Sequence, residues 1–163
     1  MSIRAAVRLI GSAVILLASA AWGFGRIRAE RRKTDELAAF CGLVRYIGEN
    51  IAHFSRPLPE IYADYSDEVL GRIGFLDALC VSGMEAAVRT MTVTDDEKCG
   101  REIKAFASAI GGGYREEQTQ LCEYTFSRLS GVLAERRESA KSREKLYRTI
   151  PVLIALSVIL MLI

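Results

Sequence analysis

The hydrophobic residues of this 163-residue chain form two unbroken runs near its ends and periodic stripes between them. The first run, Leu9 to Gly25, and the last, Thr149 to Ile163, contain no charged residue. At 1.5 Å per helical residue the first run spans about 25 Å, and the last spans about 27 Å if its helix starts at Leu146. Flanking arginines can extend either span toward the roughly 30 Å hydrocarbon core of a bilayer. The pattern therefore predicts transmembrane helices at residues 9–25 and 149–163.

The basic residues beside these runs predict a topology. Five Lys and Arg residues follow the first run between Arg26 and Lys33, whereas only two arginines precede it. The last run follows another basic segment, which contains Lys141, Arg143, Lys145 and Arg148. Cytoplasmic flanks of membrane helices carry the excess of Lys and Arg. We therefore expect residues 1–8 to form a short extracytoplasmic N-terminus and residues 26–148 to form a cytoplasmic domain.

Three other interpretations of the two runs and the domain stay open. Arg4, Arg8 and the small residues Ala18-Ser19-Ala20 also fit a secretory signal peptide cleaved after Ala20. The protein would then be an exported helical binding module, tail-anchored by residues 149–163. For the last run the alternative is a buried core helix, which Pro151 and the absence of a polar face disfavour. A membrane-tethered sensor would need a ligand pocket, and the sequence reveals none.

The first part of the domain predicts an amphipathic helix that ends at a proline turn. Glu36 lies on the polar flank of this helix, and Pro57 and Pro59 predict its end near Ser55, because a residue before proline is pushed out of the α region. Pro59 also suits the first turn of a short helix that follows. The apolar stripe of the first helix, at three- and four-residue steps, consists of Leu37, Phe40, Cys41, Val44, Ile47 and Ile51.

The remaining helices are predicted from caps and stops. Ser66 is a candidate N-cap for one helix over residues 67–83, and a brief helix is expected over residues 84–91. Thr94 opens a possible capping box for the next helix, which the glycines at 111–113 end. From Tyr114 onward the sequence predicts one long helix into the membrane, since residues 134–145 are rich in strong helix formers. A disordered linker over that polar stretch is the alternative.

Composition excludes several kinds of chemistry. Residues 26–148 hold twenty Lys and Arg against twenty Asp and Glu, so no nucleic-acid partner is indicated. The single histidine, His53, and four cysteines without a C-x-x-C spacing predict no metal site and no cofactor. No nucleophile motif or phosphate-binding loop is present, so the sequence predicts a non-enzymatic protein. Cys99 is expected at an exposed helix start, where a maleimide would report the topology.

The order of these features resembles the stage III sporulation protein AB family over essentially the whole chain. The resemblance is carried by Trp22-Gly23-Phe24, by the arginine-rich exit after it, by Pro57-Leu58-Pro59-Glu60, by the Phe106–Gly111 segment and by Glu117-Gln118. Phe54, Arg56 and Tyr114 depart from the family pattern. The resemblance implies a cytoplasmic six-helix bundle carried between two transmembrane helices, similar to the platform proteins of type II secretion systems.

The resemblance also implies a role and partners. The protein would be a scaffold in the channel that links mother cell and forespore and is needed for forespore development. It would sit in the mother-cell membrane facing the forespore, beside a secretion-type ATPase and the membrane and ring subunits of the channel. A homo-oligomer is a further possibility.

The proline turn is the candidate partner-binding site, because prolines leave little conformational freedom to lose on binding. The alternative is that Leu58 packs into the core and the prolines only end a helix. The candidate residues, with the second family segment included, are Arg56, Pro57, Leu58, Pro59, Glu60, Glu117 and Gln118.

Overall fold

The computed structural model describes residues 3–54 and 56–162, with the side chains of residues 28–54 and 56–140. This part of the chain is all-α and contains no strand. Its elements are α1 (Ile3–Phe54), α2 (Leu58–Asp64), α3 (Glu68–Arg72), α4 (Phe75–Ser82), α5 (Met84–Val88), the 3₁₀ helix η1 (Thr92–Asp95), α6 (Glu97–Ala109) and α7 (Arg115–Leu162). The all-α prediction is therefore confirmed.

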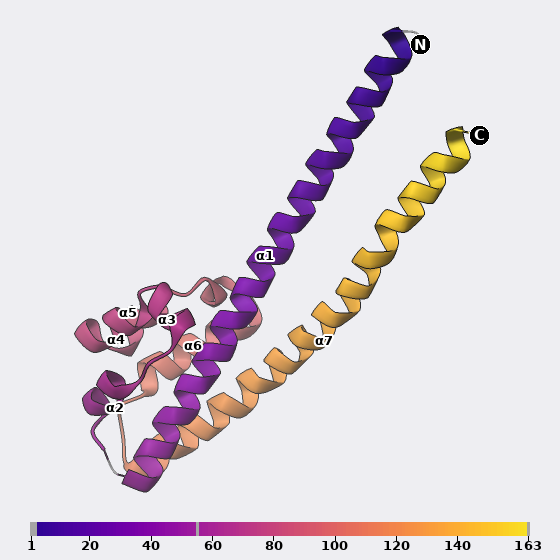
Figure 1. The fold of residues 1–163 in the computed structure, drawn as a ribbon. Coiled ribbons are helices and arrows are strands. Elements are labelled where there is room, and N and C mark those ends of the chain that lie inside the picture. Colours follow the sequence, from indigo (N-terminus) through magenta and orange to yellow (C-terminus); the bar gives the residue numbers. More distant parts are fainter. Residues whose placement is uncertain (1–2, 55, 163) are drawn as a thin grey trace.

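Two long helices organise the fold. α1 has 52 residues and α7 has 48, so each is about 70–80 Å long. They pack against each other along the bundle, where α2 to α6 lie to one side of them (Figure 1). Beyond the bundle both helices continue toward the two chain ends, which lie at the same end of the molecule (Figure 1). The polar stretch 134–145 is thus helical, as predicted, and α7 continues through Pro151 to Leu162.

The predicted membrane segments, residues 9–25 and 149–163, fall outside the residues whose side chains are described. Among the residues that the structure describes, no helix combines the length and the apolar character that a membrane crossing requires.

The helix predicted over residues 67–83 is in fact two helices. Its N-cap is Asp67 rather than Ser66, and the Asp67 carboxylate accepts a hydrogen bond from the Leu70 amide at 2.9 Å. Gly74 adopts φ 75°, a left-handed conformation that a helix cannot contain, so α3 ends and α4 begins there. The prediction failed because an isolated glycine inside a helical pattern is usually tolerated.

The predicted helix start at Thr94 is also wrong. Residues 92–95 form η1, and Thr94 is buried with its hydroxyl donating to the Met91 carbonyl at 2.7 Å. The cap of α6 is Asp96, whose carboxylate accepts from the Lys98 amide at 2.9 Å. Ser/Thr and Asp are both good N-caps, so adjacent candidates cannot be separated by pattern alone.

The core lies between α1, α7 and the short helices. Every residue of the predicted stripe on α1 is buried, which confirms that prediction. Phe40 stands at the centre, with its ring edge-on to Phe75 of α4 and Phe106 of α6 at centroid distances of 6.1 and 5.9 Å. Such edge-to-face pairs add to the burial of apolar area. One central phenylalanine thus ties α1 to both α4 and α6.

Candidate functional site

The candidate residues from the two segments meet at one end of the bundle. We call this end the distal tip and define it as residues 52–54, 56–60 and 110–118. It lies where α1 ends and α7 begins, opposite the end that carries the two chain termini (Figure 1). A carbon added at Gly111 Cα would lie 3.3 Å from a Leu58 methyl group, so the two turns are in contact. The structure therefore joins segments that are about fifty residues apart in sequence.

The Arg56 side chain is held by ion pairs to α2. Its guanidinium bonds the Asp64 carboxylate at 2.6 Å and lies 3.6 Å from the Glu60 carboxylate, so both acids of α2 hold it. The hydrogen bond to Asp64 raises the pKa of the guanidinium above its ordinary value. Arg56 and Glu60 therefore fix the turn to α2, and a charge reversal at Arg56 would disturb the turn itself.

Leu58 and the prolines divide the turn into a packed and an exposed part. Leu58 is half-buried and packs against the core, while Pro57 and Pro59 are exposed. α2 begins at Leu58 with Pro59 in its first turn, as predicted. Leu58 thus packs on the core, as the alternative prediction states, and the exposed residues of the turn include Pro57, Pro59 and Glu60.

The start of α7 is fixed by its own polar side chains. The Glu117 carboxylate accepts a hydrogen bond from the Tyr114 backbone amide at 3.1 Å, and the Gln118 side-chain amide donates to the Gly113 carbonyl at 3.2 Å. These bonds satisfy groups that a helix start and turn would otherwise leave unpaired. Glu117 and Gln118 therefore shape the tip, and their capping accounts for them without any ligand.

Two exposed aromatic residues complete the distal tip. Phe54 and Tyr114 are 69% and 79% exposed, and the Arg115 guanidinium donates to the Ala52 carbonyl, which ties the two helix ends together. Sequence reasoning named Phe54 and Tyr114 only as departures from the family pattern. The signal that could have identified them is their position: Phe54 lies just before the proline turn and Tyr114 just after the glycine turn. No apolar stripe requires a large aromatic residue at either place.

A second polar site lies near the other end of the bundle. Glu36 of α1 is fully buried, which corrects its predicted place on the polar flank. Its carboxylate accepts from the Thr92 amide at 2.7 Å, the Thr92 hydroxyl at 2.9 Å and the Val93 amide at 3.0 Å. The carboxylate thus satisfies the free amides at the start of η1, where the helix dipole also favours a negative charge.

α7 holds the other end of η1. The Arg136 guanidinium donates to the Asp96 carboxylate and lies 3.6 Å from the Cys99 sulfur. Burial raises the pKa of Asp96, but the Lys98 amide and Arg136 outweigh this effect and leave the pKa below its ordinary value. Only 16% of the Arg136 side chain is exposed, although it lies in the polar stretch 134–145. We name Glu36, η1, Asp96 and Arg136 the η1 clasp, because they join α1 to α7.

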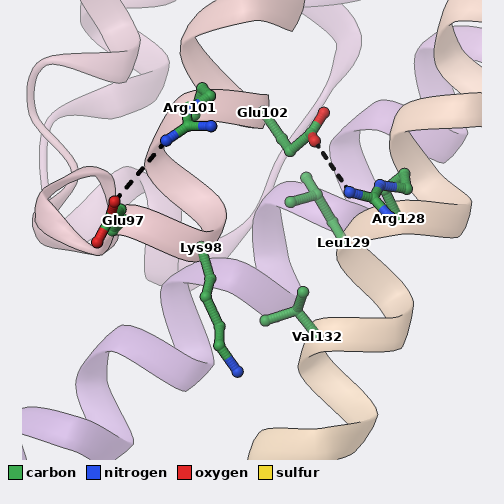
Figure 2. A pocket seen from close by; sticks show the side chains of 7 residues that line it. All are labelled: Glu97, Lys98, Arg101, Glu102, Arg128, Leu129 and Val132. Atoms are coloured by element: carbon green, nitrogen blue, oxygen red, sulfur yellow. Dashed lines mark hydrogen bonds and ion pairs between the residues drawn. The ribbon is translucent and has the colours of Figure 1, made fainter.

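Charged residues that pair with one another line a groove of the described bundle. One open groove, of about 420 Å³, lies between α6 and α7 and is shown in Figure 2. Its charges face one another, with Arg101 3.8 Å from Glu97 and Arg128 3.4 Å from Glu102. Leu129 and Val132 line the rest, and no cysteine, histidine or serine is among the lining residues. Within the described residues, no group of three or more His, Cys, Asp or Glu is placed to hold a metal ion.

The cysteines differ in access. Cys80 is exposed, whereas Cys41, Cys99 and Cys122 are buried, so the prediction of an accessible Cys99 is wrong. Burial raises the pKa of the Cys41 thiol to about 11 and that of Cys122 to about 12, and it also raises the pKa of Cys99. Cys80 is therefore the accessible thiol among the cysteines of the described bundle.

Together these features define an all-α protein in which a small bundle, closed by a clasp at one end and a structured tip at the other, is carried on two long helices. The sequence model of one family, described as stage III sporulation protein AB, matches residues 8–163, nearly the whole chain. The chain belongs to the stage III sporulation protein AB family. No curated protein and no solved structure matches it.

Proposed function

We propose that this stage III sporulation protein is a non-enzymatic membrane platform of the channel between mother cell and forespore. The observation that carries the proposal is the layout of the two long helices. Both leave the bundle at the same end and run to the chain termini, opposite the distal tip (Figure 1). Residues 9–25 and 149–163, the two uncharged apolar runs, lie on these outer parts and would anchor the protein in the mother-cell membrane.

The distal tip is the surface that would meet the other channel subunits, including a secretion-type ATPase. It would stand farthest from the bilayer in this arrangement, because the bundle separates it from the apolar runs. Its turn is held by ion pairs and caps, so little order has to be gained on binding. Phe54 and Tyr114 supply the exposed aromatic area that is enriched at protein interfaces.

A labelling experiment on intact cells tests the topology. Cys80 should resist a membrane-impermeant maleimide in intact cells and react after lysis, if the bundle is cytoplasmic. A Cys80→Ser variant is the control for labelling of the buried thiols. Labelling of Cys80 in intact cells, or a mature N-terminus at Ala21, would establish the exported form instead.

Substitutions at the tip test the platform role. Phe54→Ser and Tyr114→Ser should reduce recovery of channel subunits after crosslinking in sporulating cells, and should lower the yield of mature spores. Both side chains are mostly exposed, so stability should change by no more than about 0.5 kcal/mol. Val81→Ser is the matched control, because Val81 is 85% exposed on α4, outside the tip. Equal recovery of subunits with all three variants would refute the tip as a docking surface.

A further inference from the structure

The near-zero net charge of residues 26–148 conceals a strong separation of charge along the molecule. The bundle, residues 34–134, holds nine Lys and Arg against sixteen Asp and Glu. Residues 26–33 of α1 and 135–148 of α7 hold eleven Lys and Arg against four acids. We call these two segments the basic neck. They are the parts of α1 and α7 that connect the bundle to the outer helices (Figure 1).

Among the described residues, ion pairs neutralise a smaller share of the basic residues in the neck than in the bundle. Six of the nine basic residues of the bundle form ion pairs with acids, as Arg45 does with Glu49 at 2.8 Å. Among the described neck residues, Arg28, Arg31 and Arg137 are exposed and form no ion pair with a described acid. The neck therefore presents cationic side chains that an outside partner of opposite charge can engage.

We infer that the basic neck binds the headgroups of anionic phospholipids. This inference rests on the proposed membrane anchorage, because the neck directly adjoins both apolar runs and so would lie at headgroup level. A cluster of Lys and Arg beside a membrane helix is attracted by the negative surface potential of anionic lipids. The acidic bundle would be repelled by the same surface within a Debye length of about 8–10 Å. The two effects together hold the bundle upright, with the distal tip turned away from the bilayer.

The geometry of the neck favours a lipid surface over other anionic partners. The neck residues lie on two separate helices that diverge as they leave the bundle (Figure 1), so they face a broad surface more readily than one compact ligand. A bilayer supplies such a surface at the position where the apolar runs require it. An acidic protein segment would have to reach both helices at the membrane surface.

The test uses the full chain reconstituted in nanodiscs of phosphatidylcholine that contain phosphatidylglycerol as the minor lipid, with native mass spectrometry of the lipids retained. Phosphatidylglycerol should be enriched over its share in the nanodisc, and added salt should reduce the enrichment. Substituting Arg28, Arg31 and Arg137 together by Gln should lower the enrichment several-fold. Substituting the same three by Lys should preserve it, because Lys keeps the charge.

A matched control separates the effect of the neck residues from the effect of positive charge elsewhere on the protein. Replacing Arg72, Arg89 and Lys104 by Gln removes three exposed charges from the bundle and should leave the enrichment unchanged. Equal enrichment with the neck and control variants would overturn the inference. So would release of bound phosphatidylglycerol by a small excess of polyglutamate, which would make the neck a protein-binding surface.

A separate measurement keeps this failure distinct from failure of the platform proposal. If alkaline carbonate extracts the native chain from cell membranes, the anchorage itself is wrong. If the chain resists extraction but retains both lipids in proportion to their supply, only the lipid inference is wrong.

Discussion

Glu36 gives the strongest quantitative test of the structure, because a buried carboxylate should be costly to remove here. Replacing Glu36 by Ala leaves the Thr92 and Val93 amides without their acceptor at the start of η1. An unsatisfied buried donor costs about 1–3 kcal/mol, and the lost side-chain volume adds to this. The expected loss of folding free energy is about 3–5 kcal/mol, a large share of the 5–15 kcal/mol typical of a small protein.

Glu36→Gln should cost less than Glu36→Ala. Both amides donate to the same carboxylate oxygen, Oε2, and a glutamine carbonyl can occupy that position. The variant loses the negative charge and the pairing with Arg32 at 3.2 Å, so about 1–2 kcal/mol is expected. Arg32→Ala removes only the exposed end of this network and should cost no more than about 1 kcal/mol.

The assay follows the buried thiols during a urea titration of the full chain in detergent micelles. Cys41, Cys99 and Cys122 should react with a maleimide only when the bundle opens, so their labelling midpoint reports bundle stability. Glu49→Ala is the control, because Glu49 belongs to an exposed pair on the same helix. If Glu36→Ala and Glu49→Ala share one midpoint, the assigned role of Glu36 is refuted.

Three further predictions concern packing, pH and mechanical continuity. Gly48→Leu should destabilise the bundle by about 1–3 kcal/mol, because even a Cβ at position 48 would lie 3.0 Å from the Cys122 Cβ. Gly131→Ala should instead stabilise the bundle by up to about 1 kcal/mol, since no atom lies within 4 Å of the place that the added Cβ would take. Because the pKa of Asp96 is lowered in the folded state, its contribution to stability is present above the ordinary pKa of about 4 and is lost as the pH falls through the lower folded-state pKa. Asp96→Asn should therefore lower the free energy of unfolding at neutral pH and leave it unchanged in strong acid. Equal effects at both pH values would contradict this. A Gly-Pro insertion after Ser139 should interrupt α7, leave the thiol midpoint unchanged and abolish formation of mature spores; normal spores would refute a coupling role for α7.

The sequence predicts the helices of this fold well where the evidence is periodic. The stripe on α1 could be recognised because six apolar residues repeat at helical steps, and all six are buried. The end of α1 and the start of α2 could be located because proline restricts the residue before it and suits a first turn. The split at Gly74 could not, because the same glycine is compatible with a helix until its neighbours fix a positive φ.

The polar contacts between distant segments could not be predicted in the same way. Glu36 and Thr92 are 56 residues apart, and no local pattern links them. A glutamate beside an apolar stripe is normally solvated, so its burial depends on amides that only the folded chain brings within reach. Arg136 is similar, because its polar neighbours on α7 give no sign that Asp96 lies opposite.

The contact between the two turns of the distal tip is also a contact between distant segments. The sequence identified both turns and could not bring them together, since their contact depends on the antiparallel packing of α1 against α7. Once they are together, the residues with unusual sequence features divide into two groups. Arg56, Glu117 and Gln118 are engaged in holding the backbone, whereas Phe54 and Tyr114 contribute little to it. Because one set of residues fixes the shape of the tip and another supplies its aromatic area, substitutions at Phe54 and Tyr114 test the proposed docking surface without disturbing the fold. Substitutions at Arg56 would disturb the turn as well, so they cannot separate docking from folding.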